Sequence, residues 1–344
     1  MTLAPPRIVV ADDSGFMRRL LSHALEEAGF DVVAVAKDGD EALAACAAHR
    51  PDVLSLDLAM PGRHGLDVLK ALKAQGSPIR VVVVSAFSPA YGARAVDALA
   101  LGAFELVAKP VAGDPLNTFL TELADKMRLA AGSHVTAAAP RPTAPAAPAR
   151  ILPRISRAAR TVVIACSTGG PRALGELLPK LPARVGTGTL IVQHMPPGFT
   201  GSLAERLDRA SQLTVKEAAG GERLESGTAL LAPGGSHLRL VENGTRLSDE
   251  PAVGGLRPRA DLTIADAAKL YGEKLLLVVL TGMGKDGLEG AKEVRRHGGR
   301  ILAEAESTCT VYGMPRAVVE ADLADNVLPL HELPAAIAAE AGAA

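Results

Sequence analysis

The sequence predicts an α/β protein made of two doubly wound parallel-sheet domains. Its 344 residues exceed the roughly 250–300 residues that a single hydrophobic core usually supports. Short runs rich in Val, Ile and Leu alternate with amphipathic helical stretches, and this alternation occurs twice, on either side of a Pro/Ala-rich segment. Strands that alternate with helices are typical of βαβ units, whose strands are parallel.

The first series of strands and helices covers residues 7–128. Its predicted strands are the β-branched runs at 7–11, 32–36, 53–56, 81–85 and 105–107. From 129 to 158 the chain has no acidic residue and carries five prolines in an Ala-rich background. Such a composition buries little apolar surface and favours an extended, semi-rigid chain. We therefore expect a first domain at residues 1–128 and a linker at 129–158.

The second series defines a further domain at residues 159–344. The predicted strands are residues 161–165, 189–193, 228–232, 275–280 and 300–303. Between the third and fourth of these, alternating residues flank Asn243-Gly244, a dipeptide that favours the tight turn of a β-hairpin. We expect a hairpin at about 237–247.

Composition excludes several classes of protein. The formal net charge is −1 and aromatic residues make up 3% with no Trp, which argues against a nucleic-acid surface or an anionic membrane surface. No apolar run is long enough to span a bilayer, and we find no signal peptide. Cys46, Cys166 and Cys309 lie far apart without a CxxC pair, as expected in a reducing cytoplasm. We expect a cytoplasmic protein without membrane insertion.

Chemically useful residues follow the strands of the first domain. Asp12 and Asp13 follow the first strand, Asp57 the third, Ser85 ends the fourth and Lys109 follows the fifth. The carboxyl ends of neighbouring strands converge in a doubly wound sheet. Three carboxylates gathered there suit Mg²⁺, which prefers oxygen ligands and tolerates phosphate. The alternative is that strand ends tend to carry polar residues without any function. The occurrence of all five residues at the expected strand ends makes this alternative a poor explanation.

In the second domain, a serine follows the first strand. Ser167 stands in Cys166-Ser167-Thr168-Gly169-Gly170-Pro171, before a helical stretch. A serine at a strand-to-helix turn is exposed and lies near a helix N-terminus, which favours developing negative charge. The same pattern also suits a phosphate-binding loop, or a helix N-cap formed by Ser167 or Thr168.

A base and a group that orients it also follow strands. His194 comes directly after the second strand of this domain, and Asp286 lies in a Gly-rich segment after the strand at 275–280. Residues after parallel strands share one edge of the sheet. Ser167, His194 and Asp286 are therefore candidates for a nucleophile–base–carboxylate triad, whose members are defined by role rather than by chain order.

The segment around Asp286 allows a second interpretation. Gly282, Gly284 and Gly287 match GxGxxG after a strand, and Glu304 and Glu306 follow about twenty residues later, as in a dinucleotide-binding fingerprint. The charge of Asp286 would then face pyrophosphate, and Ser167 and His194 would have no role. A nucleotide-binding oxidoreductase is thus the alternative function, and an output domain that only binds partners is a third.

Residues 7–128 resemble the receiver domain of two-component response regulators. The resemblance is carried by ADD, LDLAMPGRHG, VVSAFS and AKP. It implies a flavodoxin-like fold, with Asp57 phosphorylated by a histidine kinase, Mg²⁺ bound at Asp12, Asp13 and Asp57, and Ser85 and Lys109 supporting the phosphoryl group. One departure is Leu106, three residues before the lysine, where receivers often carry an aromatic residue. We expect the response to phosphorylation to use other packing there, involving Phe104.

Residues 160–340 resemble the catalytic domain of the chemotaxis protein-glutamate methylesterase/glutaminase family. IACSTGGP, IVQHMPPGFT, LLAPGGSHLRL, LTGMGKDGLEG and STCTVYGMPRAV carry this resemblance. It implies a catalytic triad of Ser167, His194 and Asp286, an oxyanion donor in the backbone N–H of Met283, and no cofactor in the hydrolase site. The expected activity is phosphorylation-activated demethylation, together with deamidation, of methyl-accepting chemoreceptors. Arg259 stands where the family usually has a small residue, and an extra cation there is expected to alter which receptor segment is accepted.

Overall fold

The structure, a computed structural model, describes residues 4–86, 89–111, 113, 115–132 and 159–342. The chain divides into two compact units, Met1–Thr136 and Ala137–Ala344. Most of the predicted linker, residues 133–158, lies outside the described residues. Helix α5 (Leu116–Gly132) continues four residues into the segment assigned to the linker, because its Met127 and Ala130 are buried against the rest of the first unit.

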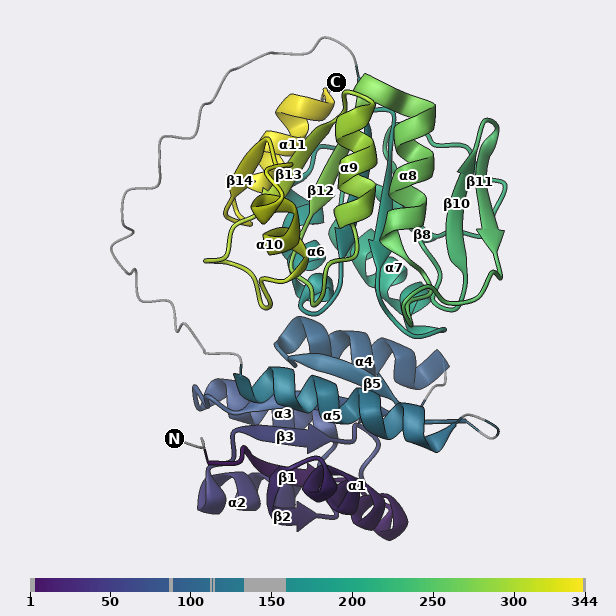
Figure 1. Cartoon of the computed structure of the whole chain (residues 1–344). Coiled ribbons are helices and arrows are strands. Elements are labelled where there is room, and N and C mark those ends of the chain that lie inside the picture. The colour runs from purple at the N-terminus through teal and green to yellow at the C-terminus, as the bar shows by residue number, and fades with distance from the viewer. Residues whose placement is uncertain (1–3, 87–88, 112, 114, 133–158, 343–344) are drawn as a thin grey trace. The chain divides into compact units, whose positions relative to one another are not determined.

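The first unit contains a five-stranded parallel sheet in the order β2-β1-β3-β4-β5 (Figure 1). Its elements are β1 Arg7–Ala11, α1 Gly15–Glu27, β2 Asp31–Ala36, α2 Gly39–His49, β3 Val53–Leu56, α3 Gly65–Ala74, β4 Arg80–Ser85, α4 Pro89–Leu101, β5 Glu105–Ala108 and α5. The strand order reverses between β1 and β3, so the loops after these two strands diverge and leave a crevice at the carboxyl edge.

The second unit contains a seven-stranded parallel sheet in the order β14-β13-β12-β6-β7-β9-β8 and a separate hairpin, β10-β11. Its strands are β6 Thr161–Cys166, β7 Gly188–Gln193, β8 Thr214–Glu217, β9 Thr228–Leu231, β10 His237–Val241, β11 Gly244–Ser248, β12 Leu275–Val279, β13 Arg300–Glu304 and β14 Asn326–Leu328. Its helices are α6 Gly170–Leu177, α7 Phe199–Ala210, α8 Ala260–Tyr271, α9 Leu288–Arg296, α10 Met314–Glu320 and α11 Leu333–Ala341, with 3₁₀ turns at Leu178–Lys180 and Gly272–Lys274.

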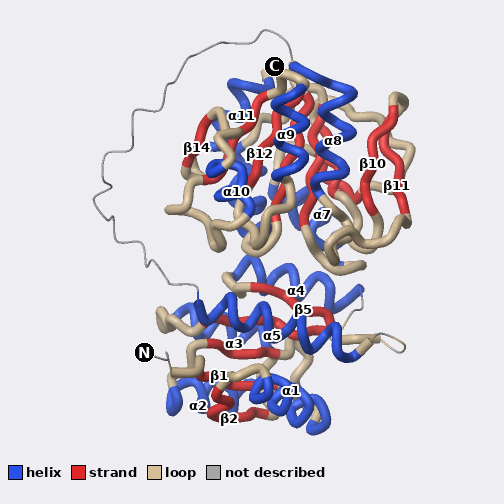
Figure 2. The backbone as a smooth tube through the Cα atoms, viewed as in Figure 1, coloured by secondary structure: helices blue, strands red, loops and turns tan. Residues whose placement is uncertain are grey.

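The connections explain the layers of the second unit. From β6 the chain proceeds through α6 and α7 toward one edge of the sheet, then returns through α8 to β12 and continues through α9 toward the other edge. Because such crossovers are right-handed, the two pairs of helices cover opposite faces. Figure 2 shows the strands lying between helices, and Figure 1 shows α8 and α9 on one side and α6 and α7 on the other.

The prediction of two doubly wound parallel sheets is confirmed. All ten strands predicted for the two sheets are present, with bounds within two residues, but the pattern missed the short strands β8 and β14. Both are edge strands with polar or exposed positions, so they lack a continuous apolar run. In the hairpin, Val241 pairs with Gly244, so the two-residue turn is Glu242-Asn243, one residue earlier than expected.

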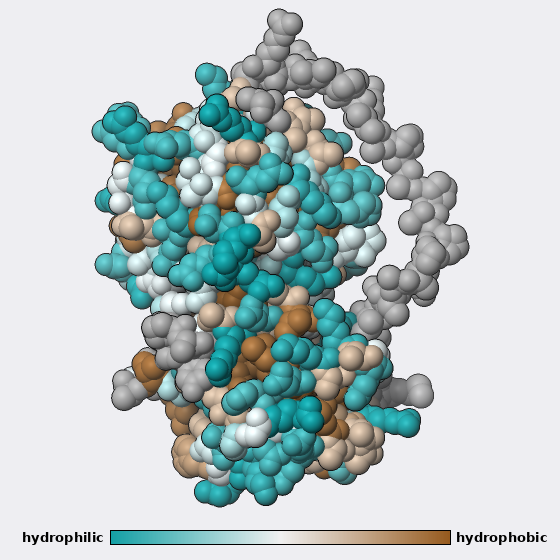
Figure 3. Space-filling view, turned by 180° about the vertical axis from the view of Figure 1, so that it is seen from behind, coloured by the Kyte–Doolittle hydropathy of each residue, from teal (hydrophilic) through white to brown (hydrophobic). Residues whose placement is uncertain are grey.

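The three central strands of the second unit, β12, β6 and β7, are buried along their whole length. Burial on both faces requires continuous apolar runs such as VVIA and LLLVV. By contrast, the face shown in Figure 3 mixes hydrophilic residues with scattered hydrophobic ones.

Of the helices in the described residues, none has the length and apolarity needed to cross a membrane.

One buried polar side chain joins the loops that follow β6 and β7. Gln193, at the end of β7, donates from Nε2 to the carbonyl oxygens of Ser167 (3.0 Å) and His194 (2.8 Å). Its Oε1 accepts from the Cys166 thiol at 3.1 Å. The amide is thus fully bonded, as a buried polar group requires, and it fixes the two loops relative to each other.

Gly170 leaves the space that this amide occupies. A Cβ at position 170 would overlap Gln193 Oε1 and lie 3.0 Å from Cys166 Sγ, whereas a Cβ at Gly175, in the same helix, would meet nothing within 4 Å. Gly170→Ala should therefore destabilise the protein by about 1–3 kcal/mol through overpacking. Gly175→Ala, the matched control, should stabilise it by about 0.5–1 kcal/mol. Denaturant midpoints of the full chain measure both, and equal midpoints would contradict this account of Gly170.

Candidate functional sites

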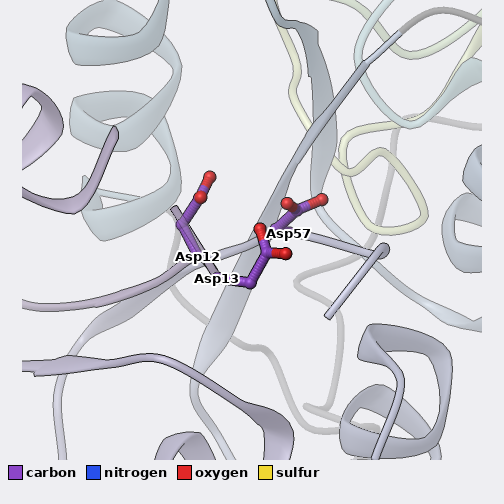
Figure 4. Close-up of side chains that lie close together, drawn as sticks. All are labelled: Asp12, Asp13 and Asp57. Carbon is purple, nitrogen blue, oxygen red and sulfur yellow. The ribbon is translucent and has the colours of Figure 1, made fainter. Parts of the chain in front are cut away.

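The acidic residues predicted for the first unit meet at one crevice. Oxygen atoms of Asp12, Asp13 and Asp57 all lie within 4.8 Å of one another, and Figure 4 shows the three side chains side by side after β1 and β3. Asp12 and Asp57 are buried, at 0% and 2% exposure, while Asp13 is exposed. Register explains the meeting, because Ala11 and Leu56 pair as the last residues of β1 and β3, so Asp12 and Asp57 follow them side by side.

Lys109 lies between the two buried carboxylates. Its Nζ is 2.6 Å from Asp57 Oδ2 and 2.7 Å from Asp12 Oδ2. Burial alone would lower the pKa of Lys109, but Asp57 and Asp12 raise it above its ordinary value, so the lysine stays charged. Burial raises the pKa of Asp12 despite the opposing effect of Lys109. If all four groups are ionised, three carboxylates and one ammonium leave two net negative charges, which suits a divalent cation.

The donor set of this pocket fits Mg²⁺. The ligands are carboxylate oxygens, which Mg²⁺ prefers. Asp12 Oδ2 is buried and receives no hydrogen bond of good geometry within the described residues, although the lysine is close.

Ser85 is buried at the end of β4, where its hydroxyl donates to the carbonyl oxygen of Ala86 at 3.3 Å. Leu106 and Phe104 are both buried, at 1% and 4% exposure.

In the second unit, Ser167 lies on the loop after the middle of three adjacent strands. The order β12-β6-β7 places it between the loops that carry Asp286 and His194. Its backbone N–H donates to the carbonyl oxygen of Thr281 at 3.0 Å. Gly169, two residues later, has φ +81° and caps α6, a conformation that glycine adopts without strain. This turn gives the serine its place at the carboxyl edge.

His194 and Asp286 are in direct contact. His194 Nε2 lies 2.7 Å from Asp286 Oδ2. An ionised carboxylate only accepts hydrogen bonds, so Nε2 carries the proton and Nδ1 of the neutral ring is the basic nitrogen. Across the described part of the chain, neither His194 Nδ1 nor the Ser167 hydroxyl has a hydrogen-bond partner. Of the three triad candidates, the structure thus joins two by a hydrogen bond and brings the serine to the neighbouring loop.

Asp286 is held by backbone donors as well. Oδ2 also accepts from Ala260 N–H at 2.7 Å, and Oδ1 accepts from the N–H groups of Asp261 and Gly287, both at 3.0 Å. Burial would raise the pKa of this carboxyl, but hydrogen bonds from His194 and the backbone hold it well below its usual range. Asp286 is therefore a fixed negative charge over the whole physiological range of pH.

Gly282 brings the β12 loop close to the serine. A Cβ at Gly282 would lie 2.9 Å from Ser167 Cβ and 3.0 Å from its backbone nitrogen, so only glycine permits this approach. The next residue, Met283, is exposed. No acceptor for its N–H occurs among residues 4–86, 89–111, 113, 115–132 and 159–342. A backbone donor without a protein partner is thus available next to the nucleophile candidate.

Two contributors to this site were not predicted from the sequence. Asp261 is 7% exposed, and its Oδ1 accepts from the N–H groups of Gly287 and Gly290, both at 2.8 Å. Gln193 joins the loops of Ser167 and His194, as described above. The available signal was a polar residue at the end of an apolar strand for Gln193, and an acidic residue in the first turn of an apolar helix for Asp261.

The structure argues against the dinucleotide interpretation. The start of α9, where pyrophosphate would bind, is already occupied by the carboxylates of Asp261 and Asp286. Glu304, a candidate for ribose binding, is fully buried and accepts from Thr281 N–H and the Thr308 hydroxyl. Glu306 pairs with Arg316 at 3.1 Å. The helix start and Glu304 are thus already bonded within the protein, whereas Glu306 lies in an exposed ion pair.

Comparisons with known proteins identify both parts of the chain. The family model "CheB methylesterase" matches residues 162–337, and "Response regulator receiver domain" matches residues 8–121. A protein-glutamate methylesterase/protein-glutamine glutaminase of Symbiobacterium thermophilum is 41% identical over 98% of both chains. One of Thermotoga maritima is 40% identical over 95% of this chain and 96% of its own.

A solved structure also resembles the second unit. The CheB methylesterase catalytic domain of Thermotoga maritima has a TM-score of 0.51 and 45% identity, and it covers 52% of this chain and 97% of that one. Matching relatives span nearly the whole chain, and in this chain the receiver model matches ahead of the methylesterase model. The chain therefore belongs to the protein-glutamate methylesterase/protein-glutamine glutaminase family, with a response-regulator receiver domain ahead of its methylesterase domain.

Proposed function

We propose that this chain removes methyl esters from glutamate side chains of chemoreceptors, with Ser167 as the nucleophile. The observation that carries the proposal is the 2.7 Å contact of His194 with a buried carboxylate, on loops that flank the serine. A base oriented by a carboxylate and next to a hydroxyl is the arrangement that activates serine. Kinship with the methylesterase family supports the choice of a methyl ester as the substrate.

The reaction would proceed in two halves. Ser167 Oγ attacks the ester carbonyl carbon while His194 Nδ1 takes the hydroxyl proton. The imidazolium returns this proton to the methoxy oxygen, the C–O bond breaks, and methanol leaves an acyl-enzyme. Water, activated by the same nitrogen, then releases glutamate and free serine. With a glutamine side chain the leaving group is ammonia, which gives deamidation.

Met283 would supply an oxyanion donor. Its N–H follows the glycine that contacts Ser167 and has no acceptor within the described residues. A preorganised donor of this kind contributes about 3–4 kcal/mol to transition-state stabilisation in comparable enzymes. The lowered pKa of Asp286 serves the same step, because a carboxylate that remains ionised stabilises the imidazolium.

We further propose that a histidine kinase phosphorylates Asp57 and thereby activates the hydrolase. Asp12, Asp13 and Asp57 would hold Mg²⁺, which when bound offsets the charge of the phosphoryl group. Lys109, already in contact with Asp57, would pair with a phosphoryl oxygen, and the Ser85 hydroxyl would turn from the Ala86 carbonyl to bond another.

The division into a receiver at 1–128, a linker at 129–158 and a catalytic domain at 159–344 remains part of the proposal. The family models support it, since they match residues within each proposed domain and none of the linker. Helix α5 ends at Gly132, so the last helix of the first domain continues four residues beyond the proposed boundary at residue 128.

Ser167→Ala should lower methanol release from a methylated receptor fragment by at least about 10³-fold, because no other group replaces the nucleophile. Thr168→Ala, next to it, is the comparison variant and should retain far more activity. Asp57 should still be phosphorylated in both. Near-parent turnover by the Ser167 variant would show that another residue is the nucleophile.

Asp286→Asn should reduce kcat by about 10⁴-fold, as in a chymotrypsin-type triad, because an amide donor favours the wrong imidazole tautomer. Neither parent nor variant should bind NAD(P), which calorimetry measures directly. Micromolar NAD(P) binding that tightens when the charge is removed would instead favour the dinucleotide function.

A small phosphodonor with Mg²⁺ should raise the parent's rate of methanol release about tenfold, a change of about 1.4 kcal/mol. Asp57→Asn should stay at the basal rate, and chelation of Mg²⁺ should abolish the parent's response. Asp67→Asn removes a carboxylate that pairs with Lys70 on α3 and should respond as the parent does. A full response by the Asp57 variant would contradict this site of phosphorylation.

A further inference from the structure

Arg259 is turned toward the buried carboxylates rather than toward solvent. Its Nη2 lies 2.8 Å from Asp261 Oδ2 and its Nε lies 3.5 Å from Asp286 Oδ1. Nη1 donates to the carbonyl oxygen of Val253 at 2.9 Å, and only 20% of the side chain is exposed. The three nitrogens of the guanidinium are thus committed within the protein, and the expectation that this cation selects the receptor segment is not supported.

The charges near His194 are unusual for a triad. Asp261 and Asp286 both accept from the N–H of Gly287, at 2.8 and 3.0 Å, so two carboxylates share one small region. Burial, followed by the charge of Asp286, raises the pKa of Asp261, while hydrogen bonds from the Gly290 N–H and then from Arg259 oppose this shift. Two carboxylates and one guanidinium carry a single net negative charge; without the guanidinium they would carry two.

We propose that Arg259 is a positioning residue that neutralises Asp261, so that the His194 imidazole faces one net negative charge. This inference rests on the proposed hydrolase function. It assigns to position 259 a role in setting the pH at which the base becomes active, because an excess negative charge would favour the imidazolium, which cannot accept the serine proton.

Other charged groups surround this cluster but do not replace Arg259. His237, on β10, accepts the backbone N–H of Arg259 through Nδ1 at 3.2 Å and donates from Nε2 to the Pro251 carbonyl at 3.3 Å. Arg239 on β10 pairs with Asp266 on α8 at 2.6 Å, and Arg257, Lys285 and Glu289 on neighbouring segments are exposed. Glu289 pairs with Lys292 at 2.7 Å, and the Arg257 guanidinium, within the described residues, donates to the carbonyl oxygens of Asp249 and Glu250 and to no carboxylate.

The test is the pH profile of kcat/KM for methanol release by the full chain, whose acidic limb marks loss of the proton from the base in the free enzyme. Arg259→Gln should move this limb to higher pH by about one unit. Asp261→Asn should move it to lower pH, since it removes one negative charge and its Oδ1 still accepts from the backbone. The double variant should restore the parent's limb, and Arg259→Lys, which keeps a cation, should stay close to it.

Arg257→Gln is the matched control, because it removes a cation two residues away that contacts no carboxylate. The pH dependence of Ser167 labelling by a fluorophosphonate probe gives a second measurement, independent of receptor binding. Should Arg259→Gln fail to fold, as judged by thermal melting, the opposite shift of Asp261→Asn decides the question.

Two results would overturn the role of Arg259. One is an acidic limb of the pH profile of Arg259→Gln that coincides with that of Arg257→Gln. If Arg259→Gln does not fold, the corresponding result is an acidic limb of Asp261→Asn that stays where the parent has it. The other is a double variant that keeps the shift of the single variant, since the effect would then be structural. A parent that releases no methanol would contradict the hydrolase function itself, whereas an active parent with an unmoved limb contradicts only this inference.

Discussion

The hydrogen bond between His194 Nε2 and Asp286 Oδ2 is the interaction on which the candidate catalytic site depends. It fixes the imidazole on the loop after β7 through a carboxylate on the loop after β12, with β6 and its serine between them. Three backbone N–H groups complete the coordination of Asp286. Because these donors come from the start of α8 and α9, the orientation of the base is tied to the packing of two helices, and it does not rely on one flexible loop.

Both domains use the same property of parallel sheets for different chemistry. In each, the functional residues follow adjacent strands at the point where the strand order reverses, so residues distant in sequence meet at one edge. The receiver gathers three carboxylates and a lysine there, an arrangement suited to a divalent cation and a phosphoryl group. The second domain gathers a hydroxyl, an imidazole and a carboxylate, which suit acyl transfer.

Much of this could be predicted from the sequence, because buried parallel strands are continuous apolar runs and their last residues mark the functional edge. The candidate site residues Asp12, Asp57, His194 and Asp286 were predicted in this way. Edge strands β8 and β14 were missed because they are short and partly exposed. The contacts that Gln193, Asp261 and Arg259 make in the site could not be predicted, since they join segments 25 or more residues apart. The protonated nitrogen of His194 likewise follows only from three-dimensional geometry.

The central claim is that Asp286 keeps the proton on Nε2 of His194 and leaves Nδ1 to act on Ser167. Nitrogen-15 chemical shifts of the imidazole in the full chain, assigned by comparison with His194→Gln, test this directly. Above the acidic limb of the activity profile, the account predicts a protonated Nε2 with a strongly hydrogen-bonded, downfield proton, and an unprotonated Nδ1. A neutral ring that carries its proton on Nδ1, unchanged in Asp286→Asn, would contradict it.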